Sequence, residues 1–178
     1  SNGGGLKVID LDEDGDYDVV SADGNNGHVN WFANNGSESF TKNTIENSGM
    51  SNEACIGVGD IDGDGKHEIY FGVPPAAGSN DATWGTYIFE QGADMTFPVA
   101  HTLLLRYGMT TADNFRPAGY ALGDVDSDGK VELVTVDRGQ KRMSIDALAG
   151  NDLDNLSSFV NEHLDTDNLA GGGVYDVD

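Results

Sequence analysis

The nine-residue stretch that decides the fold is Asp10-Leu11-Asp12-Glu13-Asp14-Gly15-Asp16-Tyr17-Asp18. Carboxylates stand at its positions 1, 3, 5 and 9, and a glycine stands at position 6. Apolar residues typical of strands lie on both sides, in the ranges 6–9 and 19–20. Alternate carboxylates in a tightly turning loop point toward one centre, and the glycine permits a backbone angle that a side chain would resist.

The same pattern recurs along the chain. The second copy is Asp60, Asp62, Asp64, Gly65 and Glu68, the third is Asp124, Asp126, Asp128, Gly129 and Glu132, and a fourth begins at Asp176 and Asp178. Position 7, which is Asp16, Lys66 or Lys130, varies in charge. Such variation is expected if that residue offers a metal only its carbonyl oxygen. We therefore predict that positions 1, 3, 5, 7 and 9 of each copy are metal ligands.

The predicted ion is Ca²⁺. It takes roughly 6–8 hard oxygen ligands in flexible geometry, which suits these loops better than the octahedral preference of Mg²⁺. We expect about three ions per chain, an incomplete fourth site, and a structural role for the metal. Without a cation, carboxylates packed this closely repel and raise one another's pKa.

Two other interpretations of the pattern are an EF-hand and an acidic surface turn. An EF-hand needs a glutamate at position 12 and helices on both sides. Position 12 here is Ser21, Phe71 or Thr135, and the flanking residues favour strands. A plain acidic turn explains a single copy, but three copies in the same strand context argue against it.

The chain resembles FG-GAP/VCBS repeats in three features: the acidic loops, the small or glycine-rich residues that lead into them, and the strand that follows each loop. The range 8–45, which includes the run 28–36 (HVNWFANNG), is especially similar to a VCBS repeat. The resemblance covers nearly the whole chain. It implies four-stranded β-propeller blades with Ca²⁺ between the first two strands of each, but it does not imply one role, because adhesion, lectin and lyase proteins share this repeat.

The fold class that we predict is all-β, with three four-stranded antiparallel propeller blades and the start of a fourth. The expected strands are 6–9, 19–22, 28–33, 40–45, 54–59, 69–73, 86–90, one within 97–105, 120–123, 133–136, 142–147 and 159–164. The range 1–178 is one propeller segment, with repeats at about 6–50, 51–118 and 119–169, and with 170–178 opening the next. Loop starts lie 50, 64 and 52 residues apart, a spacing typical of propellers.

Three blades do not close a propeller, since known propellers have about 4–8. We therefore expect further blades in the same parent chain, or copies that pack end to end and cover the exposed strand edges. The glycine-rich start and the end inside a metal loop also suggest a segment of something longer.

Composition narrows the function. Net charge is −22, with 31 acidic and 9 basic residues. Nucleic acid and anionic membranes need a basic surface, so both are disfavoured as partners. No stretch is apolar enough to span a membrane, and the chain does not open with a signal peptide. The single cysteine, Cys55, lies in an apolar run and is expected to be buried.

Extra length in the second repeat suggests a ligand-contacting loop. Arg106, Tyr107 and Arg116 bring cationic and aromatic groups together in an otherwise acidic chain. Insertions in repeat proteins often lie on the binding face. The alternative is a solvated loop whose arginine stems pack on the surface.

Three functions remain open. The first is an extracellular or cell-surface, calcium-stabilised module that binds a protein or glycan in adhesion or assembly. The second is a fragment of a propeller-type polysaccharide lyase, in which Arg106, Tyr107, Arg116 or His101 would be catalytic candidates. The third is a spacer or filament subunit with stacking blades. No catalytic triad, zinc spacing or phosphate loop stands out, which favours a protein that is not an enzyme.

Overall fold

The computed structural model describes residues 5–23, 28–47, 55–73, 85–97, 103–105, 117–137, 142–149 and 159–165. Its described regular structure consists of strands. They are β1 (Leu6–Ile9), β2 (Asp18–Asp23), β3 (His28–Asn34), β4 (Phe40–Asn47), β5 (Ile56–Gly59), β6 (Glu68–Val73), β7 (Gly85–Phe89), β8 (Leu103–Leu105), β9 (Pro117–Gly123), β10 (Glu132–Asp137), β11 (Arg142–Leu148) and β12 (Phe159–Asp165). None of these residues forms a helix that is long and apolar enough to cross a membrane.

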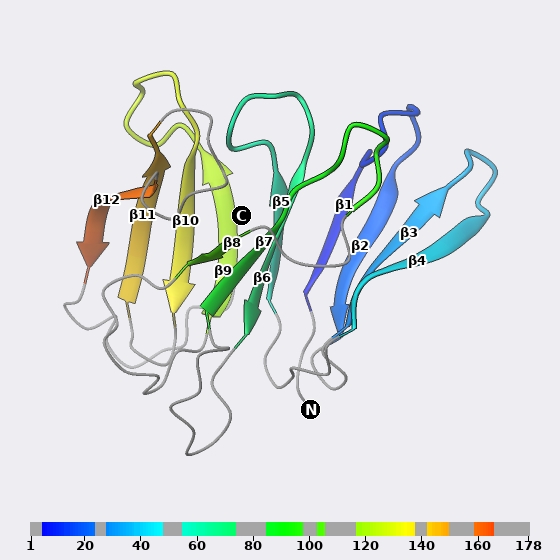
Figure 1. Ribbon diagram of the computed structural model, residues 1–178, viewed down its shortest axis with the longest axis horizontal. Helices are drawn as coiled ribbons and strands as arrows, with labels where there is room; N and C mark the ends of the chain where they lie inside the picture. The colour runs from blue at the N-terminus through cyan, green and yellow to red at the C-terminus, as the bar shows by residue number, and fades with distance from the viewer. Residues whose placement is uncertain are drawn as a thin grey trace, which may run out of the picture.

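The strands form three four-stranded antiparallel sheets, each built from four consecutive strands. We call them the first sheet (β1–β4), the second sheet (β5–β8) and the third sheet (β9–β12). Figure 1 shows them side by side, like neighbouring propeller blades. The predicted all-β class with four-stranded blades is confirmed. The repeat boundaries and the larger propeller stay predictions.

The strands begin and end within a few residues of the predicted bounds, and one difference recurs in all three sheets: the second strand begins one residue earlier than predicted. Position 9 of each acidic loop is already part of the second strand of its sheet. Asp18 pairs with Ile9, Glu68 with Gly59, and Glu132 with Gly123. The backbone of this last carboxylate residue is therefore fixed by the ladder, which holds its side chain at the base of the loop.

Alternation along the strands creates two cores between the sheets. In β2, Val20 and Ala22 are buried while their neighbours are only partly so. They belong to the core between the first and second sheets, with Ile69, Phe71 and other residues of the second sheet. Residues on the opposite face of the second sheet form another core with the third sheet; its members are Cys55, Ile61, Tyr70, Ile88, Tyr120, Leu133 and Leu148. The second sheet is therefore buried on both faces, which explains why all five residues of β7 are buried.

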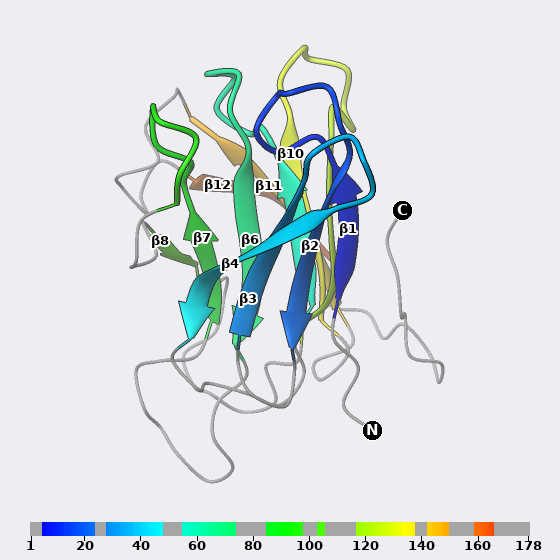
Figure 2. The same ribbon diagram turned by 90° about the vertical axis from the view of Figure 1, so that its right-hand side faces the viewer.

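First strands of neighbouring sheets contact one another, β1 with β5 and β5 with β9. Figure 2 shows β1 on one side of the molecule and the fourth strands toward the other. Glycines allow the close approach. A Cβ added at Gly5 would lie 2.6 Å from Ile56 Cγ2, and one added at Gly57 would lie 2.6 Å from Tyr120 Cβ.

We predict that Gly57→Ala destabilises the protein by about 1–3 kcal/mol, because the new methyl group forces β5 and β9 apart. The measurement is chemical unfolding at equilibrium. Gly123→Ala is the matched control, since a Cβ there meets nothing within 4 Å. Equal effects of the two substitutions would show that the close approach does not limit the packing.

Candidate metal centres

The three acidic loops join the first two strands of each sheet. We call them loop 1 (residues 10–18), loop 2 (residues 60–68) and loop 3 (residues 124–132). Figure 1 shows all three at the same edge of the molecule. This follows from the topology, because the three sheets run through their strands in the same order and lie side by side.

Each loop turns through two residues with left-handed backbone angles, at positions 4 and 6. They are Glu13 and Gly15 (φ 60° and 97°), Gly63 and Gly65 (76° and 89°), and Ser127 and Gly129 (67° and 91°). The predicted need for glycine at position 6 is confirmed. Position 4 was not predicted, because only loop 2 has a glycine there and the other two loops accept strain at a residue with a side chain.

Carboxylates inside each loop accept hydrogen bonds from its backbone. The first aspartate accepts from the glycine N–H at position 6 at 3.0 Å in every loop. The aspartate at position 5 accepts from the N–H of position 7 at 2.8–2.9 Å. These bonds fix the turn. In loop 2 the second oxygens of these carboxylates are engaged as well, since Asp60 Oδ1 accepts from the N–H of Gly63 at 2.7 Å and Asp64 Oδ2 pairs with Lys66.

The carboxylate at position 9 closes each loop from below. It accepts the backbone N–H of position 2 in all three copies, in the pairs Leu11–Asp18 (3.2 Å), Ile61–Glu68 (3.0 Å) and Val125–Glu132 (2.8 Å). The three position-9 side chains are between 0% and 1% exposed. A charge buried to this extent is costly unless other groups or a cation compensate it.

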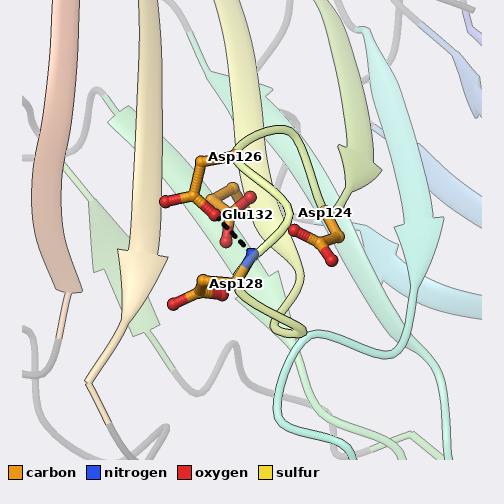
Figure 3. A group of neighbouring side chains, drawn as sticks. All are labelled: Asp124, Asp126, Asp128 and Glu132. Carbon is orange, nitrogen blue, oxygen red and sulfur yellow. Dashed lines mark hydrogen bonds between the residues drawn. The ribbon is translucent and has the colours of Figure 1, made fainter.

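Three groups of carboxylates converge closely enough to hold a metal ion, with one oxygen from each residue within 4.8 Å of the others. Loop 3 brings together Asp124, Asp126, Asp128 and Glu132. Figure 3 shows these side chains gathered around the turn of the loop, with the N–H of Asp128 donating to Asp126 at 2.9 Å. Loop 1 contributes Asp10, Asp12 and Asp14, and loop 2 contributes Asp60, Asp62 and Glu68.

Loop 1 differs from the others at position 9. Asp18 is shorter than a glutamate, and both its oxygens are engaged: Oδ2 also accepts from the indole N–H of Trp31 at 2.9 Å, and Oδ1 accepts from the N–H of Asn34 at 2.8 Å. Asp18 lies outside the group formed by Asp10, Asp12 and Asp14, and so does Asp16. The assignment of both as ligands stays a prediction.

Loop 2 differs at position 5. Asp64 forms an ion pair with Lys66 and lies outside the converging group. That contact holds the pKa of Asp64 below its usual value, chiefly through the hydrogen bond from Lys66. In loop 3 the equivalent pair, Lys130 and Asp128, is 3.8 Å apart. The side chain of each position-7 lysine thus pairs with the aspartate at position 5 of its own loop. That the lysine carbonyl oxygens bind a metal stays a prediction.

Burial and repulsion between neighbouring carboxylates raise the pKa of several acidic side chains in loops 1 and 2. Burial is the main cause of the raised pKa of Asp12 and of Asp62, and neighbouring aspartates add to it. Burial raises the pKa of Glu68 from 4.5 to about 8, with further contributions from Asp62 and Asp60. This agrees with the expectation that the carboxylates raise one another's pKa when no cation is bound, although burial is the larger cause.

Three of these oxygens are buried and have no hydrogen-bond partner: Asp10 Oδ1, Asp12 Oδ1 and Glu68 Oε1. Buried polar atoms are nearly always paired, so each such oxygen calls for an explanation. A cation is a fitting partner, since the donor set consists entirely of carboxylate oxygens. The residues present therefore fit a metal ion at these loops.

A hollow of about 330 Å³ separates loop 2 from loop 3, and it is lined by Asp60, Ile61, Asp62, Gly63, Gly129, Lys130, Val131 and Leu148. The other predicted site residues lie outside the described residues. They are Asp176 and Asp178 of the incomplete fourth copy, and Arg106, Tyr107 and Arg116 of the proposed ligand loop.

The structure adds two residues that the sequence did not single out as part of the loops. Trp31 packs against the core between the first and second sheets, and its indole N–H also donates to Asp18. Gln91 follows β7 and bonds to both loop 1 and loop 2. The sequence does contain a pattern that could have pointed to Gln91. The residue directly after each loop pairs with the third strand, Val19 with Phe32 and Ile69 with Phe89. Two residues beyond that partner stands an amide side chain, Asn34 in the first sheet and Gln91 in the second.

Comparison with known families agrees with this geometry. Residues 10–71 match the FG-GAP-like repeat. The match covers loop 1, loop 2 and the strands between them, and it confirms the resemblance stated for these residues. A search of curated proteins found no match.

We predict that the metal-free protein loses stability as the pH rises from about 5 to 8. The unfolded chain releases the Glu68 proton near its usual pKa of 4.5, while the folded protein keeps it until about 8. Between pH 5 and 8 the native state therefore binds more protons than the unfolded chain. For one extra bound proton, the free energy of unfolding falls by at most about 1.4 kcal/mol for each unit that the pH rises.

The measurement is urea unfolding at several pH values in chelator. Glu68→Gln should flatten the slope, while Glu13→Gln, which alters an exposed side chain in loop 1, should leave it unchanged. An unchanged slope in Glu68→Gln would mean that this carboxyl does not carry the effect.

Proposed function

We propose that the protein is a calcium-stabilised β-propeller-type module that binds a protein or glycan partner outside the cell. The observation that carries the metal part is the set of unpartnered buried oxygens, Asp10 Oδ1, Asp12 Oδ1 and Glu68 Oε1, in loops with a common backbone geometry. The match to the FG-GAP-like repeat supports the propeller-type module.

Calcium is favoured over other ions by the donor atoms. Every side chain that converges in the three loops is a carboxylate, and none is a histidine or cysteine. Such hard donors suit Ca²⁺, Mg²⁺ and Mn²⁺. Three or four carboxylates close together in one loop suit Ca²⁺, because Mg²⁺ usually keeps several waters and is held by one or two carboxylates.

The role proposed for the metal is structural. When bound, the ion supplies positive charge to carboxylates that converge at the junction of two strands, among which Glu68 and Glu132 are buried. The unfolded chain has no preformed site, so the binding free energy adds to the stability of the folded state. A −22 chain gains further from neutralisation of its acidic loops, since self-repulsion opposes compact folding.

We propose an extracellular setting for these calcium sites. Calcium sites of extracellular modules bind at about 10⁻⁴–10⁻³ M, a concentration range found outside the cell. The partner is proposed to be a protein or a glycan, contacted by Arg106, Tyr107 and Arg116. The lyase alternative depends on the same residues, and a lyase assay on acidic polysaccharides separates it from a binding role.

Assembly of copies is a second candidate role, favoured by one observation on the first sheet. Leu6 and Val8 stand four and two residues before loop 1 and are 62% and 60% exposed. The residues four and two before loop 3, Tyr120 and Leu122, pack against Gly57 and Gly59 of the preceding sheet. Leu6 and Val8 thus occupy positions that receive a sheet of the same kind, and we assign a second copy of this chain as that partner.

We predict a Ca²⁺-specific rise in melting temperature. Three sites of the expected affinity at about 10 mM Ca²⁺ contribute at least about 4 kcal/mol in total, which corresponds to a rise of about 8 °C or more for a chain of this size. The measurement is thermal unfolding with Ca²⁺, with Mg²⁺ and with chelator. Asp12→Asn should reduce the Ca²⁺ effect, while the neighbouring Glu13→Gln should not. An equal rise with Mg²⁺, or no rise, contradicts the calcium assignment.

We also predict that the protein self-associates and that Leu6→Lys combined with Val8→Lys reduces the association, because two charges replace apolar contacts. Sedimentation velocity at several concentrations measures this. Leu6→Met combined with Val8→Ile, which keeps both side chains apolar, is the matched control. A wild-type chain that stays monomeric throughout rules out assembly by this face.

A further inference from the structure

Gln91 is a buried amide that contacts two acidic loops at once. It lies two residues after β7 and is 1% exposed. Its Nε2 donates to the carbonyl of Leu11 in loop 1 at 2.8 Å, and its Oε1 accepts from the N–H of His67 in loop 2 at 3.2 Å. One planar group therefore spans the first and second sheets.

A tight turn holds Gln91 in place. The N–H of Gly92 donates to the carbonyl of Thr96 at 2.7 Å, and the N–H of Met95 donates to the carbonyl of Gly92 at 3.0 Å. The Thr96 hydroxyl donates to Asp94 Oδ1 at 2.6 Å. Nε2 of Gln91 also donates to the carbonyl of Met95 at 3.5 Å. The turn thus restrains the segment that carries Gln91, while the shorter bonds of its amide are those to loops 1 and 2.

The two contacts fall beside the carboxylates that converge in each loop. Leu11 lies between Asp10 and Asp12, whose Oδ1 atoms are buried and unpartnered. Its N–H is held by Asp18 and its carbonyl by Gln91, so the peptide is restrained at both ends. His67 directly precedes Glu68, which has an unpartnered Oε1. A shift of either loop around an ion moves an atom bonded to Gln91.

The other sheets show what this contact adds. The register of the strands places Asn34 and Leu148 at the positions equivalent to Gln91. Asn34 is one methylene shorter and donates to Tyr17 in its own loop. Leu148 has no amide and lines the hollow beside loop 2. Among the described residues, this amide link therefore joins loops 1 and 2 and has no counterpart between loops 2 and 3.

We propose that Gln91 is a positioning residue that makes cation binding at loops 1 and 2 cooperative, while loop 3 binds independently. Ordering one loop fixes the amide, and the fixed amide holds the other loop in its binding geometry. By linkage, each site then raises the affinity of the other by the same factor. A buried hydrogen bond contributes about 0.5–1.5 kcal/mol, which corresponds to a factor of about two to twelve in affinity.

The experiment uses the full chain and Tb³⁺ as a calcium probe. Trp31 donates to Asp18 in loop 1, so Tb³⁺ emission excited through tryptophan reports loop 1. The part of the emission that Asp12→Asn removes belongs to that loop. The loop 1 affinity is then measured with loop 2 disabled by Asp62→Asn, in the wild-type background and in the Gln91→Met background, which keeps the volume but not the amide.

The proposal predicts that Asp62→Asn weakens Tb³⁺ binding at loop 1 about two- to twelvefold when Gln91 is present, and leaves that binding unchanged in the Gln91→Met background. Asp126→Asn in loop 3 should leave loop 1 unchanged in both backgrounds. If Gln91→Met does not fold, Gln91→Glu replaces it, because glutamate can accept from His67 but its carboxylate cannot donate to Leu11.

Equal effects of Asp62→Asn in both backgrounds, or no effect in either, overturn the proposal. Because the coupling rests on the proposed metal function, the two failures must be separable. Saturable Tb³⁺ binding without coupling defeats only the role of Gln91, whereas no Tb³⁺ binding at loop 1 defeats the metal function as well.

Discussion

The structure depends on a buried carboxylate that closes each acidic loop. Asp18, Glu68 and Glu132 begin the second strand of their sheets and accept the N–H of the residue at position 2. This bond ties the end of the loop to its beginning and places the side chain at position 2 toward the neighbouring sheet; Leu11 and Ile61 are buried there. The same interaction thus shapes the loop, anchors the strand pair and contributes to the cores between sheets.

Burying the carboxylate at position 9 costs free energy, and the three loops compensate the buried group in different ways. In loop 1, Trp31 and Asn34 satisfy the remaining capacity of Asp18. In loop 2, Glu68 keeps one oxygen unpartnered, and its pKa is raised to about 8 by burial. In loop 3, Glu132 converges with three aspartates. A repeated sequence pattern therefore produces three sites of different character, because residues outside the pattern decide how the buried charge is compensated.

Much of the fold was predictable from the sequence, because its signals are local. The acidic loops, the glycine at position 6 and the apolar runs on either side predicted twelve strands in three sheets, and the strands lie within a few residues of the expected ranges. The converging aspartates were predictable for the same reason. The left-handed angle at Glu13 and Ser127 was not, since neither residue type favours it.

Contacts between distant parts of the chain could not be predicted from the sequence. The pairing of Trp31 with Asp18 and the bond from Gln91 to Leu11, 80 residues away, depend on strand register and on how two sheets pack. The close approach of Gly57 to Tyr120 likewise exists only once β5 and β9 are face to face. Sequence periodicity specifies each sheet, but it does not specify which side chains meet between sheets.

The central claim is that the three loops hold calcium ions that compensate their buried carboxylates. The most direct test is the metal content of the folded chain after equilibrium dialysis against Ca²⁺ in excess Mg²⁺, measured by mass spectrometry of the metals. The account predicts about three calcium ions per chain and a loss of one ion when Asp124 and Asp126 are both replaced by asparagine. A folded chain that retains no calcium would contradict it and leave the loops as acidic turns.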